Sequence, residues 1–377
     1  MKKAYHFPLL LVIFFSCLFL SKVSAQVPLR ENPAAIEAIK VTLDHIYNFE
    51  FETALKRLEN GHGLGNHPAN SLINAVLIYW RDSPLVPGSE IYQTYEKYLN
   101  QAIELSEPFL EQERLYSEGA FYSLAGYGFL AELYADEGAS LKALSMARQA
   151  YKYLKIGKEK MDEIPDFYFS TGLYNYYRVK YPELHPFYKS FLWLFEGGDK
   201  ALGIEQLKIC TSRAVFTRNE ALIYLFHIYL RYENNPGLAY PYARELVNKF
   251  PRNIKFSGHL AEVLVAMNEF DRAEGLCDTL LKSDRTVYQF CGNVLKGIIY
   301  EKTGRLQEAE KTLSHALQLH DSLRKQESNY LSMIYAAQAR IEDRRHHTDL
   351  AATLYKKALK ADPYVPVKLE AETYLDK

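Results

Sequence analysis

Histidines are the residues of this chain whose type most readily suggests metal chemistry, but their spacing favours no metal site. His62 and His67 lie in and just after a glycine-rich stretch, with no acid or cysteine at ligand spacing. His346 and His347 are neighbours, so on a helix their side chains would diverge by about 100°. Neither an HExxH nor a CxxC pattern occurs in the sequence. We therefore predict no metal ion and no cofactor.

Glycine-rich segments offer the next candidate chemistry, the binding of a nucleotide or another anion. The segment 61–65 lacks the third glycine of a dinucleotide loop and follows a predicted helix rather than a strand. In the turn Gly197-Gly198-Asp199, the aspartate is expected to act as the N-cap of the next helix. The sequence contains no GxSxG, phosphate-loop or calcium-loop pattern. No catalytic residue is predicted, and we expect the protein not to be an enzyme.

The N-terminus has the pattern of an export signal. Lys2 and Lys3 precede an apolar run over residues 7–20, and small residues ending at Ala25 follow it. The run is shorter than the roughly 20 residues that a membrane-spanning helix needs, so cleavage after Ala25 is favoured over a retained anchor. A lipoprotein processed at Cys17 is a further alternative. We expect export to the periplasm or cell envelope of a Gram-negative bacterium, with no transmembrane segment after cleavage and with peripheral envelope association left open.

Charge and cysteine content narrow the classes of partner. After cleavage, 42 (45 less 3) basic side chains face 46 acidic ones, and the basic residues form no long cluster. Nucleic acid is therefore not an expected partner. Three cysteines remain, Cys210, Cys277 and Cys291. A local Cys277–Cys291 bridge stays open, although Cys210 and Cys277 fit helical positions where small apolar residues pack.

The elements that would position any site recur along the chain with a near-regular period. Ala239, Ala273, Ala309 and Ala351 are separated by 34, 36 and 42 residues. Twelve positions before them stand His227, Ala261, Gly297 and Ala339, so three of the four units have a small residue where two antiparallel helices would touch. The segment Leu124–Ala150 repeats this spacing with Ala131 and Ala143. Apolar residues recur at helical spacing, and alternating polarity is almost absent, so the fold is predicted to be all-α.

This pattern resembles the tetratricopeptide repeat family. In the unit from Cys291 to Asp321, Gly297, Tyr300, Ala309, Leu313 and Ala316 match the family's sequence of small, aromatic and bulky positions. The resemblance implies a right-handed α-solenoid of antiparallel helix pairs, and an exported bacterial member of the family. The expected organisation is given by residue ranges: a signal peptide over 1–25 and a solenoid over 26–377, with an irregular N-terminal and central part over 26–218, regular repeats over 219–363 and a C-terminal cap over 364–377.

In that family the first helix of each pair lines a concave groove that holds a partner. Transferred to this chain, the family's groove positions are Glu132, Tyr224, Ile228, Arg231, Glu262, Val294, Ile298, Glu301, Arg340 and Asp343. The lysine and asparagine clamp that some members use for a terminal carboxylate is not reproduced at these positions. We therefore expect a non-catalytic scaffold that binds a protein or peptide of unknown identity through its concave groove.

A block of aromatic residues over 167–195 departs from the repeat pattern. Twelve of its residues, from Phe167 to Phe195, are Phe, Tyr or Trp, and Pro182 and Pro186 interrupt it. One interpretation is an irregular helix pair whose rings fill the core. The other is an aromatic binding surface, because exposed rings give much contact area for little loss of entropy. The alternative function is therefore a small-ligand or lipid-binding protein that uses this block.

Overall fold

The computed structural model describes residues 27–61, 64–184, 196–323 and 328–376, and within these ranges every regular element is helical. The predicted signal peptide, His62 and the rings at 187–195 lie outside them. The elements are η1 (Leu29–Glu31), α1 (Pro33–Tyr47), α2 (Phe51–Glu59), α3 (Pro68–Asp82), α4 (Glu90–Leu110), α5 (Tyr116–Asp136), α6 (Ser140–Lys160), α7 (Phe167–Leu184), α8 (Lys200–Arg213), α9 (Arg218–His227), the π-helix η4 (Ile228–Tyr232), α10 (Pro236–Lys249), α11 (Ile254–Ala266), α12 (Phe270–Leu281), α13 (Thr286–Lys302), α14 (Leu306–Ser322), α15 (Ser328–Arg344), α16 (Thr348–Lys360) and α17 (Val365–Leu375).

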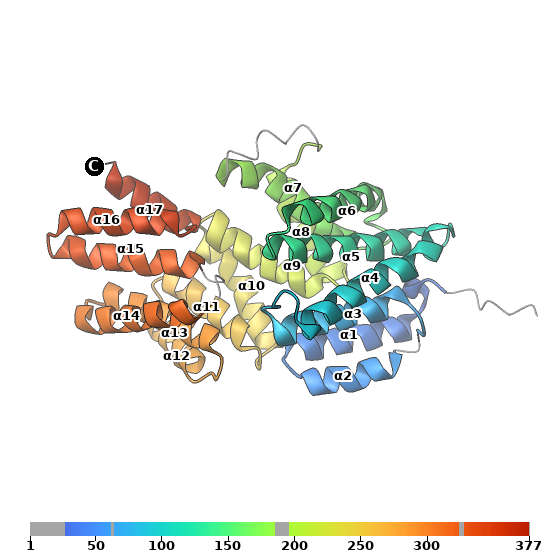
Figure 1. The fold of residues 1–377 in the computed structure, drawn as a ribbon, viewed down its shortest axis with the longest axis horizontal. Coiled ribbons are helices and arrows are strands. Elements are labelled where there is room, and N and C mark those ends of the chain that lie inside the picture. Colours follow the sequence, from blue (N-terminus) through green and yellow to red (C-terminus); the bar gives the residue numbers. More distant parts are fainter. Residues whose placement is uncertain (1–26, 62–63, 185–195, 324–327, 377) are drawn as a thin grey trace, which may run out of the picture.

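Helices pack chiefly on their neighbours in the sequence, so the molecule is a stack of antiparallel pairs (Figure 1). The predicted regular region forms four such pairs, α9–η4 with α10, α11 with α12, α13 with α14, and α15 with α16. Successive first helices also touch, α11 with α13 and α13 with α15. The prediction of an all-α chain is confirmed, and the arrangement is compatible with an α-solenoid.

The turns inside the pairs share one geometry. In six pairs the second residue after the first helix has a positive φ, and the next helix begins two residues later; these residues are Phe49, Gly138, Asn234, Asn268, Gly304 and His346. In five of these turns the following N–H donates to the carbonyl five residues earlier, as in Arg305 to Tyr300 (2.8 Å) and His347 to Glu342 (2.9 Å). This is the Schellman closure of a helix C-terminus. The repeat therefore extends to backbone conformation, including the first pair, α1 with α2.

The small residues of the sequence pattern lie where two helices touch. Ala261, Ala273, Ala309 and Ala339 are completely buried. A Cβ added at Gly297 would lie 2.6 Å from the Leu313 side chain on the partner helix, which is closer than carbon atoms approach. The predicted spacing of twelve residues is thus explained by helix contact within each pair.

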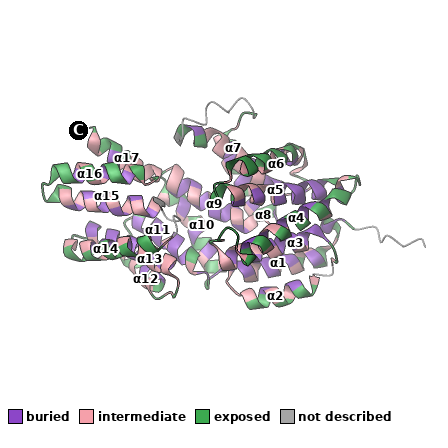
Figure 2. Cartoon of the chain, viewed as in Figure 1, coloured by how far each residue is buried: buried purple, intermediate pink, exposed green. Residues whose placement is uncertain are grey.

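The two helices of a pair differ in burial. α5, α11 and α13 bury 11, 9 and 10 residues, whereas their partners α6, α12 and α14 bury three each. Figure 2 shows the difference clearly along α6, which is largely exposed beside the buried α5. First helices are covered on most sides by neighbouring pairs, while second helices bury a single stripe. Side chains that face the inside of the stack therefore come mainly from first helices.

The N-terminal helices also pack against the regular repeats, about 200 residues further along the chain. The Tyr47 hydroxyl donates to Glu220 (2.7 Å), and the Asn253 amide donates to the Tyr47 carbonyl (2.7 Å). The rings of Trp80 and Phe256 lie 5.7 Å apart. A single hydrophobic cluster accordingly joins α1–α5 to residues of α9–α11. One side of the stack is therefore closed by helices from the start of the chain.

Two prolines lie inside helices, although a proline is expected to end a helix, and one histidine is more constrained than its loop position suggests. Pro108 does not end α4, which continues to Leu110, and Pro182 lies inside α7. Both prolines stand near the C-terminal end of their helix, so each removes at most one hydrogen bond before the helix ends. His67 ends the loop before α3 but is buried, and its Nδ1 accepts from Ala69 N–H as the N-cap of α3 (3.2 Å). None of the described helices is both long and apolar enough to span a bilayer.

Candidate functional site

The ten groove residues expected from the sequence separate into three groups in the structure. Ile228, Val294 and Ile298 are buried in the hydrophobic core between helix pairs. They are therefore core residues and not accessible groove residues. Neighbouring pairs pack so closely on the first helices that positions on their inner side are covered as well.

The second group consists of charged residues that neutralise each other. The Arg231 guanidinium donates from Nε (3.1 Å) and Nη2 (2.7 Å) to the two oxygens of Glu262, which also accepts from the Tyr330 hydroxyl (3.0 Å). Arg231 lies over the Tyr364 ring at 4.5 Å, which ties the π-helix to the C-terminal segment. Burial opposes its charge, but Glu262 holds the pKa of Arg231 above its usual value. This bidentate pair joins two successive helix pairs, α9–α10 and α11–α12, and the Tyr330 hydroxyl links it to α15.

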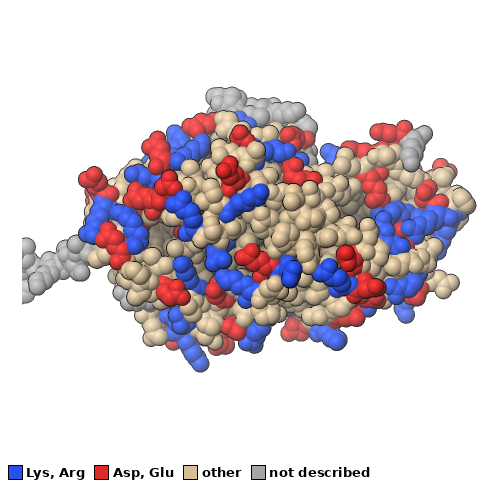
Figure 3. Space-filling view, turned by 180° about the vertical axis from the view of Figure 1, so that it is seen from behind, with Lys and Arg blue, Asp and Glu red and all other residues tan. Residues whose placement is uncertain are grey.

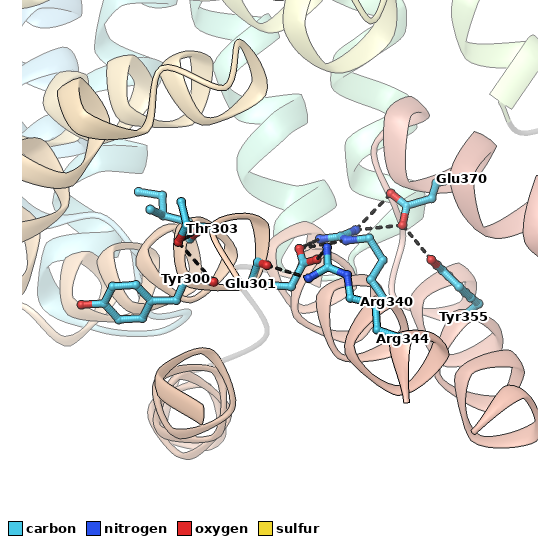
Figure 4. A network of polar contacts seen from close by, with 8 residues as sticks. Tyr300, Glu301, Thr303, Arg340, Arg344, Tyr355 and Glu370 are labelled. Atoms are coloured by element: carbon cyan, nitrogen blue, oxygen red, sulfur yellow. Dashed lines mark hydrogen bonds and ion pairs between the residues drawn. The ribbon is translucent and has the colours of Figure 1, made fainter. Parts of the chain in front are cut away.

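A second network of the same kind links the last pairs to α17 (Figure 4). Glu301 is fully buried and accepts from Arg340 Nε (2.9 Å) and Arg344 Nη2 (2.6 Å). Arg340 also donates to Glu370 (2.8 Å), which accepts from the Tyr355 hydroxyl (2.8 Å). Asp343, the last predicted residue of this region, accepts from the Tyr374 hydroxyl (2.8 Å). These predicted groove residues hold the C-terminal cap to the stack.

The third group is Glu132 and Tyr224, and Glu132 lines a cavity between the N-terminal helices and the repeats. Its volume is about 670 Å³, within the range of small-ligand sites (roughly 300–1,000 Å³). Glu132 lines it directly, whereas Tyr224 is half-buried on α9 and is close enough for the Glu132 charge to raise the pKa of its hydroxyl, after burial. We call this cavity the inner pocket. Its walls come from α3–α5 with the loop 83–89 on one side, and from α9–η4, α11–α13 and α15 on the other.

The lining of the inner pocket is aromatic and charged. Its aromatic residues are Phe49, Tyr79, Trp80, Tyr92, Tyr95, Phe129, Tyr288 and Tyr330, and its charged or titratable ones are Glu132, Asp136, Glu137, His227, Arg231, Lys255, His259 and Arg285. The acids all come from α5 and its C-cap, and the basic residues and histidines come from the opposite wall. The pocket is therefore polarised from one wall to the other.

The acidic wall is poorly compensated. Glu132 is accessible to solvent yet has protein on most sides, and this desolvation, with the charges of Asp136 and Glu220, raises its pKa to about 7. Desolvation also raises the pKa of Asp136. Burial and then the Glu132 charge raise the pKa of the hydroxyls of Tyr79 and Tyr95. Lys255 partly offsets the acids, and its ammonium lies 5.1 Å over the Trp80 ring.

The opposite wall contains two neutral histidines. The rings of His227 and His259 lie 5.2 Å apart, and His259 stacks on Phe226 at 4.6 Å. Burial, followed by the charges of Arg231 and Lys255, lowers the pKa of His259 well below its usual value. Within the described residues, neither His259 Nδ1 nor His227 Nε2 has a hydrogen-bond partner. A buried polar atom in this state is costly unless a ligand or water satisfies it.

His227 was the exception in the sequence pattern, and the structure shows a matching irregularity. The unit with histidine in place of Ala or Gly is also the unit that contains the π-helix Ile228–Tyr232. Its turn closes from Asn235 N–H to the Tyr229 carbonyl, six residues back instead of five. Such π-helical turns are frequent at functional sites. The broken repeat was therefore a usable signal for the inner pocket, but the aromatic residues of α3 and α4 gave none.

The described part of the aromatic block is largely packed. Phe167 and Tyr176 are fully buried, and the Tyr176 hydroxyl donates to Glu233 (2.5 Å). Gly172 and Gly203 approach so closely that a Cβ on either would lie within 3 Å of the other's carbonyl oxygen. Asp199 caps α8 as expected, accepting from Ala201 (2.8 Å) and Leu202 (3.0 Å) N–H groups. The described rings therefore support the core interpretation for residues 167–184.

The remaining candidates for chemistry are inert in the described residues. No disulfide joins the described cysteines, and burial raises the pKa of the Cys277 thiol to about 12. No group of three metal-ligating side chains occurs in the described ranges. On the face shown in Figure 3, acidic and basic side chains are interspersed. The inner pocket is thus the strongest candidate site.

Comparison with protein families and with curated proteins identifies no match for this chain.

Proposed function

We propose that this protein is a non-catalytic scaffold of the tetratricopeptide type, a right-handed superhelix that holds a segment of a protein partner in its inner pocket. The observation that carries the proposal is the contrast within the inner surface. Most predicted groove residues of the regular repeats are buried or bonded to other side chains, whereas the pocket presents carboxylates and histidine nitrogens without partners among the described residues, together with partly exposed rings. We propose that it acts in the periplasm or on the cell envelope, a location that the N-terminal sequence pattern supports.

Site-directed photo-cross-linking tests the proposal in the native envelope. Benzoylphenylalanine at position 129, where Phe129 lines the pocket, is expected to capture a specific protein. The matched control is the same residue at position 141, because Leu141 is 85% exposed on the outer helix α6. Adducts at 129 and not at 141 support the proposal. Equal capture at both positions, or no protein adduct at 129, contradicts it.

The partial enclosure of the pocket favours a second candidate function, the binding of a small ligand. The volume and aromatic lining fit such a ligand, and the described rings of the aromatic block are packed, so the site would be the inner pocket rather than residues 167–184. Native mass spectrometry of the protein purified from its envelope distinguishes the two functions. A constant added mass that Phe129→Trp removes would favour the small ligand.

A further inference from the structure

Two carboxylates on the acidic wall of the inner pocket have no partner among the residues that the structure describes. Glu132 and Asp136 stand four residues apart on α5, so they lie on one face of the helix. Both line the pocket and are exposed to it, and in the described parts of the chain neither has a hydrogen bond or an ion pair. This contrasts with Glu137 at the C-cap of α5, which accepts from the Tyr92 hydroxyl (2.7 Å).

The charges around this pair leave an acidic excess. Glu220, which accepts from Tyr47, adds a third carboxylate whose charge acts on Glu132. Among the described groups that shift Glu132, Lys255 is the one cation.

The pocket's arginines do not compensate for this excess. Arg231 is matched by Glu262. Arg285 donates to the Ser83 carbonyl and lies 5.3 Å over the Tyr288 ring, and it is not among the groups whose charge shifts the pKa of Glu132. A ligand that brings positive charge would balance the acidic wall.

Aromatic rings surround the unpaired acids. Tyr79 and Tyr95 come from α3 and α4, and their rings lie 6.4 Å apart. Both line the pocket, and the Glu132 charge contributes to the raised pKa of each hydroxyl. A cation held against aromatic faces and a carboxylate is favoured by both, most strongly where it is partly desolvated. The combination of two acids and two tyrosines is therefore suited to an alkylammonium or guanidinium group.

An independent observation on the opposite wall points to a ligand. His259 is 6% exposed, lines the same pocket, and its Nδ1 has no hydrogen-bond partner among the described residues. A neutral imidazole accepts or donates one hydrogen bond at each nitrogen. A peptide group next to a bound side chain offers both an N–H and a C=O.

We propose that the inner pocket recognises a lysine or arginine side chain of the partner peptide, with the cation between Glu132 and Asp136 and against Tyr79 and Tyr95. The peptide backbone beside this side chain hydrogen-bonds to His259. This inference rests on the proposed scaffold function and names the chemistry of its partner.

The test compares pentapeptides of sequence acetyl-Gly-Ala-X-Ala-Gly-amide, with X as arginine, lysine, norleucine or glutamate, titrated by NMR at pH 8. The arginine and lysine peptides are expected to bind at least about tenfold more tightly than the norleucine peptide, which has nearly the shape of lysine without its charge. The double variant Glu132→Gln/Asp136→Asn should abolish this preference. The control Glu104→Gln/Asp271→Asn removes two exposed acids that do not line the pocket and that have no partner among the described residues, and it should leave the preference unchanged.

Several outcomes overturn the proposal. Equal affinity for the lysine and norleucine peptides, no detectable binding of either basic peptide, or a preference that survives the double variant would each contradict it. Tighter binding of agmatine, a free guanidinium compound, than of the arginine peptide would contradict a peptide as the source of the cation. Where one of these outcomes occurs and protein adducts still form at position 129, the cation inference fails while the scaffold function stands.

Discussion

The acids of the regular repeats and those of the inner pocket differ in burial and in pairing. In the repeats, Glu262 and Glu301 are buried, and each is bonded to arginine within 3.1 Å. In the pocket, Glu132 and Asp136 are accessible and have no such bond in the described residues. Both kinds of acid project from first helices of the stack. Position in a repeat therefore does not separate binding residues from structural ones, whereas pairing does.

The largest expected effect on stability comes from removing an arginine that is paired with a buried acid of the repeats. Arg340→Met leaves the fully buried Glu301 with Arg344 alone and removes the bond to Glu370. Breaking a buried ion pair from one side costs about 3–5 kcal/mol. We expect a loss near the lower end in urea unfolding, because Arg344 remains. Arg244→Met, at an exposed arginine with no ion pair among the described residues, should change stability by less than about 0.5 kcal/mol. Equal losses would contradict a structural role for Arg340.

The next largest effect on stability is expected where two helices of a repeat touch, at Gly297. Gly297→Val places a Cβ 2.6 Å from the Leu313 side chain, which is itself fully buried. Overpacking of this kind costs about 1–3 kcal/mol. Gly275→Val on α12 is the matched control, because nothing lies within 4 Å of its Cβ and valine is the better helix former by a few tenths of a kcal/mol. A similar response at both glycines, measured by thermal unfolding, would refute the close-contact explanation of the repeat.

His259, on the wall of the pocket opposite the acids, is expected to make the stability of the protein depend on pH. Burial, with Arg231 and Lys255, depresses the pKa of His259, while the unfolded chain has a histidine of ordinary pKa near 6.5. Below that pH the unfolded state binds a proton that the folded state does not, so stability falls as pH falls. His259→Gln should recover up to about 1.4 kcal/mol of this loss at pH 5.5 relative to pH 7.5. If the stability of wild type and variant changed in parallel with pH, His259 would have its ordinary pKa in the folded protein, which contradicts the prediction.

Much of the fold followed from the sequence, because helix contact in a repeat needs small residues at fixed spacing. Gly297 and Ala309 predicted such a contact directly, and Gly304 predicted the turn between the two helices. The pocket did not follow, because it is formed by tertiary packing of α3–α5 against α9–α13, between residues far apart in the chain. No local pattern shows that Tyr79 and His259 will line one cavity. Nor did the repeat positions reveal that Glu262 would bond to an arginine on the preceding pair and Glu301 to arginines on the next one.

Glu132 provides the most discriminating prediction, although its effect is the smallest. Its neighbours are Asp136 on its own helix, Glu220 and Tyr224 on α9, Tyr79 on α3, Tyr95 on α4 and Lys255 on α11. The pKa of Glu132 is raised to about 7 in the fold, so between pH 4.5 and 7 the folded state binds more protons than the unfolded state. Stability therefore falls as pH rises through this window, and the cost is fully present above pH 7.

Replacing this acid should consequently stabilise the protein, in contrast to Arg340→Met. Glu132→Gln is expected to match the wild type near pH 4.5 and to exceed it by about 0.5–1 kcal/mol at pH 8, a value reduced for the solvent access of this side chain. Urea unfolding at the two pH values measures the difference, and Glu104→Gln, an exposed acid on α4, serves as the control. A destabilised Glu132→Gln at pH 8 would mean that Glu132 is a paired, structural acid like Glu301. A gain in stability together with lost binding of the basic peptides would show that this carboxylate is kept for a ligand at the expense of the fold.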